Sequence, residues 1–293
     1  MDTVANDQSA PTADGKDTTL IYRQSRWTRL THWIWAFSLF FMLLSGLQIF
    51  NARPQLYIGK QSGFEFNNTI LQIGAENTAN GPRGFTEILG HRFDTTGVLG
   101  VSARADGMRV KRGFPEWATI PGPRSLALGR RWHFFFAWLW VINGSCYLLW
   151  SLASRHLTRD LAMQRRDWRA IPASIVEHLR FRHPIGDEAA RYNPLQKLAY
   201  LAVIFVLAPL AVLTGLSMSP QMDSLLGWWL QLVGGRQSAR AIHFIVMSLF
   251  VLFTVVHVLM VVYAGPINEM RSMISGRFRV RYPRADGGGR NDA

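Results

Sequence analysis

The sequence predicts an all-α membrane protein with four transmembrane helices. The chain has 293 residues, of which 48% are hydrophobic and 17% charged, and its mean hydropathy of +0.05 resembles that of a soluble protein. The apolar residues are nevertheless pooled into four segments of about 21 to 24 residues, each long enough to cross a hydrocarbon core about 30 Å thick. Strongly polar stretches separate these segments, so we expect a chain that crosses the membrane four times.

The composition restricts the chemistry that such a protein can perform. A single cysteine, Cys146, excludes a disulfide framework, a cysteine-ligated iron–sulfur cluster, a thiolate zinc site and covalent attachment of a c-type haem. The formal net charge of +13 would suit nucleic-acid binding, but basic loops are also typical of small membrane proteins. Any cofactor must therefore use ligands other than thiolates.

The chain divides into tails, spans and loops as follows. We expect a disordered N-terminal tail over residues 1–21, a four-helix domain over 22–283 and a C-terminal tail over 284–293. The expected spans are residues 30–50, 132–152, 198–219 and 241–264, joined by the long loops 51–131 and 153–197. Pro209 is expected to kink the third span.

The distribution of basic residues predicts the orientation. Nine Arg and Lys residues lie in the 153–197 connection, namely Arg155, Arg159, Arg165, Arg166, Arg169, Arg180, Arg182, Arg191 and Lys197. The positive-inside rule then places both termini in the cytoplasm and loop 51–131 in the periplasm. That loop also holds about eleven Lys and Arg residues, but the rule is weak for loops longer than about 60 residues. Within 153–197, the stretch Leu157–Phe181 is either an interfacial helix or a solvated basic connection.

Four histidines lie inside the apolar segments, where an ionisable side chain is costly and suggests a functional site. They are His32, His133, His243 and His257. One such histidine alone could simply bond to a neighbouring helix. With both termini inside, however, His32 and His257 lie at the inner side and His133 and His243 at the outer side. His243 and His257 are fourteen residues apart, about 21 Å along a helix and within about 40° of the same face.

This arrangement predicts two metal-centred cofactors. A planar macrocycle between two helices needs one ligand from each side, and neutral imidazole suits iron in an apolar interior. Two b-type haems with axial pairs His32/His257 and His133/His243 are the economical explanation; one haem or none is the alternative. Zinc or copper would need further ligands at the same depth, and no carboxylate or thiolate accompanies either pair.

Glycines and arginines near these histidines are compatible with two bound haems, but each also has another explanation. Gly46, Gly144 and Gly215 could let a backbone approach a flat ring, or could equally allow close helix packing. The arginines next to His32 and His133 could pair with haem propionates or act as interfacial anchors. They are Arg26 and Arg29 on one side and Arg130 and Arg131 on the other.

The histidine spacing resembles a known family, the bacterial cytochrome b561 and nickel-hydrogenase/formate-dehydrogenase cytochrome b superfamily. The resemblance covers about residues 22–283. Three stretches look more specifically like thiosulfate-reductase-type cytochrome b anchoring subunits: Arg130-Arg131-Trp132-His133-Phe134, Tyr192-Asn193-Pro194-Leu195-Gln196-Lys197 and Gly265-Pro266-Ile267-Asn268-Glu269-Met270.

The resemblance implies a bacterial inner-membrane subunit that exchanges electrons between membrane quinone and a catalytic subunit on the periplasmic face. In this subgroup that partner is often a molybdopterin oxidoreductase. Loop 51–131 would be either the docking surface for the partner or a cap over the outer haem. The segment Tyr192–Lys197 is one candidate wall of an inner quinone site.

Other classes of function remain open. The chain has no nucleophile–base pair or phosphate loop in a sensible context, so electron transfer, rather than stand-alone catalysis, is expected. A transporter would place polar groups along a path at mid-membrane, whereas the central turns of these spans are aromatic and aliphatic. A free-standing b561-type quinol oxidase and a haem-free anchor are the further alternatives.

Overall fold

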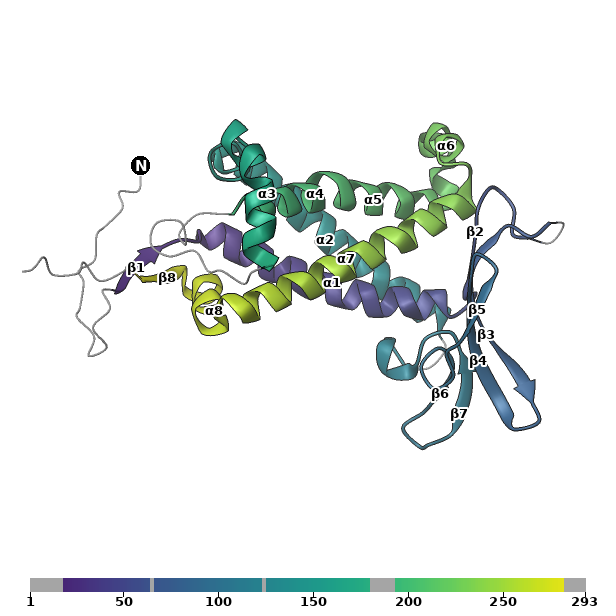
Figure 1. The fold of residues 1–293 in the computed structure, drawn as a ribbon. Coiled ribbons are helices and arrows are strands. Elements are labelled where there is room, and N and C mark those ends of the chain that lie inside the picture. The colour runs from purple at the N-terminus through teal and green to yellow at the C-terminus, as the bar shows by residue number, and fades with distance from the viewer. Residues whose placement is uncertain (1–17, 64–65, 123–124, 180–192, 282–293) are drawn as a thin grey trace, which may run out of the picture. The chain divides into compact units, whose positions relative to one another are not determined.

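The computed structural model describes residues 18–63, 66–122, 125–179 and 193–281. Its helices are α1 (Arg26–Phe50), α2 (Leu126–Ala153), α3 (Arg165–Leu179), α4 (Pro194–Ala202), α5 (Ala208–Ser217), α6 (Asp223–Leu232), α7 (Arg236–Ala264) and α8 (Pro266–Ser275). Its strands are β1 (Thr18–Tyr22), β2 (Gln55–Tyr57), β3 (Thr69–Thr78), β4 (Gly81–Ile88), β5 (His91–Asp94), β6 (Gly100–Ala103), β7 (Arg109–Arg112) and β8 (Arg277–Arg281) (Figure 1). Residues 1–17 of the predicted N-terminal tail 1–21, and the whole predicted C-terminal tail 284–293, lie outside the described residues.

Four helical stretches are long and apolar enough to cross a membrane, which confirms the four predicted spans. They are Arg26–Phe50, Leu126–Ala153, Pro194–Ser217 and Arg236–Ala264. All four begin before the predicted apolar segments, because the polar residues that precede each segment continue the helix. The protein is therefore an integral membrane protein.

The third stretch departs from a regular α-helix. It starts at α4, where the Asn193 side chain accepts a hydrogen bond from the Leu195 amide and the Gln196 side chain accepts one from the Asn193 amide. A π-helical turn, Val203–Leu207, then separates α4 from α5. Pro209 is the second residue of α5, which begins directly after this turn, and its missing amide hydrogen removes one hydrogen bond of the α-helical pattern. The predicted irregularity at Pro209 therefore takes the form of a π-helical turn.

The chain forms two compact units, and contributions from all four spans occur in each. Unit 1 comprises Met1–His32, Cys146–Phe205 and Leu252–Ala293, and unit 2 comprises Trp33–Ser145 and Val206–Val251. Cys146, the single cysteine, is exposed on the surface of its helix.

In unit 1, β1 and β8 form an antiparallel ribbon, with Thr18 opposite Arg281 and Tyr22 opposite Arg277. Residues 18–21 are thus a strand and not part of the predicted tail. The prediction was wrong at this boundary because β1 is stabilised by a partner from the far end of the sequence. Arg23 joins the ribbon to α8: its guanidinium lies 3.4 Å from the Glu269 carboxylate and 4.4 Å from the centre of the Phe278 ring.

Unit 1 also contains a buried ion pair between α3 and α4. Lys197 Nζ lies 2.9 Å from the Asp167 carboxylate, and both side chains are about 10% exposed. Desolvation disfavours the charged form of Asp167. The Gln164 amide, Lys197 and Arg166 nevertheless outweigh desolvation and lower the pKa of this carboxyl. Within the stretch Leu157–Phe181, for which an interfacial helix was one of two alternatives, a π-helical turn, Leu157–Leu161, precedes α3; Phe181 lies outside the described residues.

The all-α prediction was wrong for the loop 51–131, which forms β-structure within unit 2. Strands β2-β3-β4-β5 build one antiparallel sheet and β6-β7 a separate ribbon. The long β3–β4 hairpin turns between Thr78 and Gly81, where Gly81 takes a φ of 99°. An Asn-Gly pair such as Asn80-Gly81 is a sequence signal for a hairpin.

Close backbone contact joins the ribbon to the sheet. A Cβ atom on Gly84 would lie 2.2 Å from the Leu99 carbonyl oxygen, and one on Gly100 would lie 2.1 Å from the Gly74 carbonyl oxygen. Glycine is required at both positions, since any side chain would separate β6 from β3 and β4. These contacts make the strand region one packed body.

The strand region is also anchored to the helices of unit 2. Phe50 at the end of α1, Leu56, Ile73 and Ala241 near the start of α7 form one buried apolar cluster. Polar contacts add to it: Arg240 donates to the Arg53 carbonyl at 2.6 Å, and the Ser238 hydroxyl accepts from the Gly59 amide at 2.8 Å. The strands are therefore fixed on the same unit that holds the predicted outer histidines.

Candidate functional site

Unit 2 brings together His133 on α2 and His243 on α7. The centres of their imidazole rings are 6.3 Å apart, and the ring planes are inclined at 69°. Both side chains are only partly exposed within apolar helices. The outer pair predicted from the sequence is therefore brought together in the structure.

The hydrogen bonds of the outer pair fix which ring nitrogens are available. The Thr214 hydroxyl donates to the Leu210 carbonyl at 2.5 Å, so it must accept from Nδ1 of His243, which lies 3.0 Å away. The Nδ1 atom of His133 likewise lies 3.0 Å from the Met42 carbonyl oxygen, which can only accept. Both rings therefore carry hydrogen on Nδ1, and Nε2 keeps the lone pair needed to bind a metal.

Two glycines lie directly against these rings. A Cβ atom on Gly46 of α1 would lie 3.4 Å from Cε1 of His133, and one on Gly215 of α5 would lie 3.3 Å from Cε1 of His243. Their role is thus to let two helices approach the imidazoles closely. Gly144 differs, because its Cβ would lie 3.0 Å from the Trp35 ring, which favours the helix-packing interpretation at that position.

Unit 1 brings together the other two histidines, His32 on α1 and His257 on α7. Their ring centres are 6.2 Å apart and the ring planes are inclined at 57°. Phe253, one helical turn before His257, stacks on its ring with the centres 5.8 Å apart and the planes at 12°. The inner pair therefore has almost the same separation as the outer pair, with an aromatic side chain fixing one ring.

The geometry of both pairs fits two imidazoles on opposite sides of one metal ion. With metal–nitrogen bonds of about 2.0–2.1 Å, and about 1.1 Å from a ring nitrogen to the ring centre, opposed rings would have centres about 6.3 Å apart. Within the described parts of the chain, no group of three or more His, Cys, Asp and Glu side chains converges. A metal at either pair would therefore need a macrocycle to complete its coordination, as haem provides.

The arginines predicted near the histidines have different surroundings. The Arg29 guanidinium donates to the Ile274 carbonyl in unit 1, and its Nε atom lies 3.4 Å from the Ser25 carbonyl oxygen. Arg131 and Arg26 are exposed, and Arg130 lies over the Phe134 ring at 5.7 Å. Arg29 is thus tied to the end of α8, whereas Arg131 is exposed beside His133 near the start of α2.

The segment predicted as a quinone wall is described only in part. Tyr192 lies outside the described residues, as do Arg180, Arg182 and Arg191 of the basic connection. Asn193 caps α4, and Lys197 is paired with Asp167. The side chains of Asn193 and Lys197 therefore have structural partners.

Sequence reasoning missed two hydroxyl side chains of the outer site. Ser45 Oγ lies 3.3 Å from Nδ1 of His133, while Thr214 is the partner of His243. Each stands immediately before a glycine that lies against the same imidazole, as Ser45-Gly46 and Thr214-Gly215. A hydroxyl–glycine dipeptide inside an apolar span was the available signal.

Four apolar spans and two pairs of facing imidazoles define a membrane protein of the cytochrome b class. The chain belongs to the prokaryotic cytochrome b561 family, whose sequence model matches residues 23–276. This confirms the predicted family, with b-type haem and electron transport as its general chemistry.

Two curated relatives agree with this assignment. The "Putative protein-methionine-sulfoxide reductase subunit YedZ1" of Azospira oryzae is 36% identical over 149 residues, which are 50% of this chain and 70% of the relative. The "Probable Ni/Fe-hydrogenase B-type cytochrome subunit" of Cupriavidus necator is 28% identical over 176 residues, which are 54% of this chain and 72% of that relative. No solved structure matches the chain significantly.

Proposed function

We propose that the protein holds two b-type haems and transfers electrons between membrane quinone and an oxidoreductase subunit outside the membrane. One observation supports this above all: both histidine pairs have ring centres 6.2–6.3 Å apart, on helices long enough to span a membrane. His32 and His257 would hold the inner haem, and His133 and His243 the outer one. Because α7 supplies one ligand to each pair, it links the two sites.

Haem supplies reversible one-electron chemistry, while the protein sets orientation and potential. The Met42 carbonyl and the Ser45 hydroxyl hold His133 through Nδ1, and Thr214 holds His243 in the same way. These contacts keep Nε2 of each histidine directed away from the hydrogen-bond partners of Nδ1, and they increase the basicity of each ring. Arg29 and Arg131 remain the proposed partners of the haem propionates.

The orientation follows from charge. The basic residues of the 153–197 connection favour a cytoplasmic location for both termini, in the inner membrane of a bacterium. The strand region 51–131 and the His133/His243 pair, which belong to the same unit, then lie on the periplasmic side. Quinone would exchange electrons near the other pair, where lipid meets the helices.

The strand region supports docking of a partner. Leu89, in the β4–β5 turn, is 71% exposed and Trp117 is 80% exposed; Ile88 and Phe93 are also exposed in the β4–β5 hairpin. Large apolar side chains exposed on a polar segment outside the membrane mark interaction surfaces. A free-standing quinol oxidase would give these side chains no role, so we favour a partner subunit.

The type of partner rests on similarity. The two relatives are named as subunits of a protein-methionine-sulfoxide reductase and of a Ni/Fe-hydrogenase. We propose an oxidoreductase of the molybdopterin type, on the resemblance to thiosulfate-reductase-type anchoring subunits. Co-purification with a soluble subunit containing molybdenum is the test of this part.

The haem assignment is tested by counting haems in purified full-length protein. A pyridine haemochrome assay should give about two haems b per chain. His257→Ala and His243→Ala should each lose one haem, and the double variant both, whereas His91→Ala, at an exposed histidine of β5, should keep two. A colourless wild-type protein from haem-sufficient cells, or two haems retained in His257→Ala, would contradict the proposal.

A further inference from the structure

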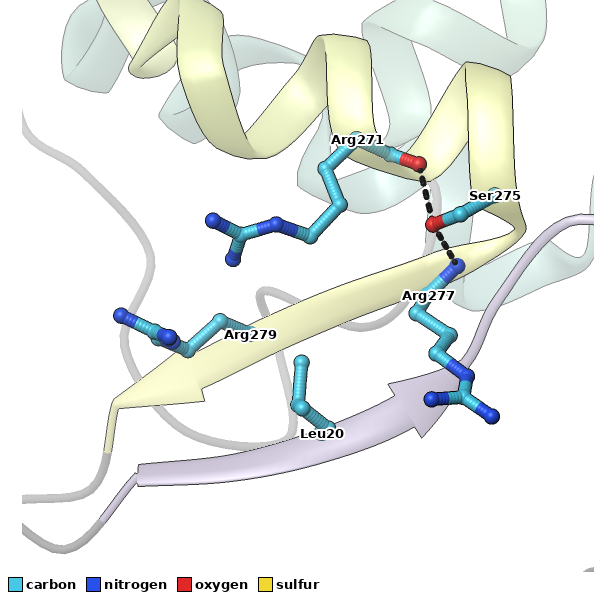
Figure 2. A pocket seen from close by; sticks show the side chains of 5 residues that line it. All are labelled: Leu20, Arg271, Ser275, Arg277 and Arg279. Carbon is cyan, nitrogen blue, oxygen red and sulfur yellow. Dashed lines mark hydrogen bonds between the residues drawn. The ribbon is translucent and has the colours of Figure 1, made fainter.

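Unit 1 contains a pocket of about 670 Å³ formed by the β1–β8 ribbon and α8. It is lined by Leu20, Arg271, Ser275, Arg277 and Arg279. Figure 2 shows Arg271 and Arg279 extending toward one end of this pocket and Arg277 toward the other, with Leu20 between Arg279 and Arg277. Three of the five lining residues are therefore cationic.

The strand register explains why these arginines share one face. Along β8, Phe278 and Val280 are buried, so the alternating residues Arg277 and Arg279 face outward. Arg271 comes from α8 and is held near them by Ser275, whose hydroxyl donates to the Arg271 carbonyl at 2.8 Å and accepts from the Arg277 amide at 3.3 Å. The basic face is thus a consequence of the fold.

The charge of this face is not neutralised within the described part of the chain. None of the ion pairs found there includes Arg271, Arg277 or Arg279. The neighbouring carboxylate of Glu269 is paired with Arg23. The pocket therefore offers the guanidinium groups of Arg271 and Arg279 to an anion at one end, with Arg277 adding positive charge at the other.

Exposed apolar side chains lie on the same ribbon and helix that form the pocket. Leu20 and Tyr22 stand opposite Arg279 and Arg277 on the outward face of the ribbon, and both are exposed. On α8, Ile267 is 77% and Ile274 65% exposed, with Met270 between them, at a spacing that forms one helical stripe. Because α8 begins directly after the α7 span, this stripe lies where hydrocarbon meets headgroups.

We infer that this pocket, hereafter the ribbon pocket, binds the phosphate group of an anionic phospholipid. Guanidinium groups bind phosphate oxygens through paired, charge-assisted hydrogen bonds, and the stripe on α8 would contact the acyl chains of the same lipid. Inorganic phosphate has the same anionic chemistry, but it has no acyl chains to contact Ile267, Ile274 and Leu20. The adjoining apolar surface therefore favours the lipid.

The test is retention of lipid by the full-length protein in detergent, measured by native mass spectrometry. Wild-type protein is mixed with phosphatidylglycerol and phosphatidylcholine of identical acyl chains. We expect retention of phosphatidylglycerol to exceed that of phosphatidylcholine, and Arg271→Gln/Arg279→Gln to weaken it at least about fivefold. The control Arg165→Gln/Arg169→Gln removes the same charge from exposed positions of α3 and should keep the preference.

Three results would overturn the inference. They are equal retention of the two lipids by wild-type protein, an equal loss in the α3 control, and displacement of phosphatidylglycerol by inorganic phosphate at millimolar concentration. If the double variant aggregates, the single variant Arg279→Gln, at an exposed position of β8, is measured instead and should show a smaller loss in the same direction.

Discussion

Thr214 on α5 accepts a hydrogen bond from Nδ1 of His243 on α7 at 3.0 Å, because its own hydrogen is donated to the Leu210 carbonyl. Thr214 is completely buried. It therefore fixes both the orientation of the imidazole and the nitrogen that carries the hydrogen. Groups that orient a metal-binding histidine in this way contribute to affinity and tune the metal.

Replacement of Thr214 with valine keeps the shape of the side chain and removes the acceptor. We expect about 10–100-fold weaker retention of the outer haem and a changed midpoint potential for that haem. The inner haem, for which we propose His32 and His257 as ligands, should keep its potential. A redox titration followed by absorbance checks both expectations.

Ser217→Ala is the matched control for Thr214→Val, since Ser217 is also completely buried on α5 but its hydroxyl donates to the Leu213 carbonyl. An equal shift of potential in Ser217→Ala would show that loss of any buried hydroxyl from this helix has the same effect. The assigned role of Thr214 would then be wrong.

The contact between Gly215 and His243 predicts a spectroscopic change. In Gly215→Ala the new methyl group would lie 3.3 Å from the ring, so the imidazole must move by a few tenths of an ångström. We expect altered g-values for the outer low-spin haem in electron paramagnetic resonance, with the inner signal unchanged. Gly227→Ala serves as the control, because no atom lies within 4 Å of its added methyl group; identical spectra for wild type and Gly215→Ala would refute the prediction.

The buried pair of Asp167 and Lys197 predicts a large loss of stability when only one charge is removed. Lys197→Met would leave the Asp167 carboxylate buried without its cation, which costs about 3–5 kcal/mol in free energy of unfolding. The double variant Asp167→Leu/Lys197→Met should recover most of this loss. Unfolding in detergent, followed by circular dichroism, compares the stability of the single and the double variant. Equal destabilisation of both variants would mean that packing, and not charge, dominates.

The same pair predicts how stability depends on pH. Because its surroundings lower the pKa of the Asp167 carboxyl below 3.8, its contribution to folding is complete above about pH 4 and is lost as pH falls further. Asp167→Asn should therefore be less stable than wild type at neutral pH, and the difference should shrink between about pH 4 and pH 2. A difference that stays constant over this range would contradict the lowered pKa.

Docking through the strand region predicts loss of the partner without loss of haem. Leu89→Ser removes an apolar side chain that is 71% exposed, so the cytochrome itself should be unaffected. If Leu89 lies in the centre of the interface, affinity for the partner should fall by about tenfold or more, measured by co-purification and by binding in detergent. Asn80→Ser, an exposed change at the β3–β4 turn, should bind normally, and equal binding by Leu89→Ser would place the interface elsewhere.

The spans and the histidine pairs could be predicted because their physical causes act over short stretches of sequence. About twenty apolar residues in succession are long enough to cross the hydrocarbon core wherever they occur in a sequence. A histidine among them is energetically costly and therefore indicates a functional site. Depth along each span then sufficed to assign the partners His32 with His257 and His133 with His243.

The strands and the hydroxyl contacts could not be predicted in the same way. Strand β1 depends on β8, which is distant in sequence, and the short strands of loop 51–131 depend on close contacts at Gly84 and Gly100 that only the folded backbone reveals. Ser45 and Thr214 resemble ordinary small residues of a span until a histidine from another helix is placed beside them.

The pairing of β1 with β8 also has a consequence for biogenesis. The first described strand emerges from the ribosome before any span, while its partner is made only after the last span has been synthesised. Until then the backbone amides and carbonyls of Thr18–Tyr22 lack their final partners and remain open to chaperones and proteases. Pairing of β1 with β8 thus distinguishes a chain synthesised through β8 from a truncated one. A protease that cleaves unpaired β1 would therefore act selectively on chains whose translation stopped before β8.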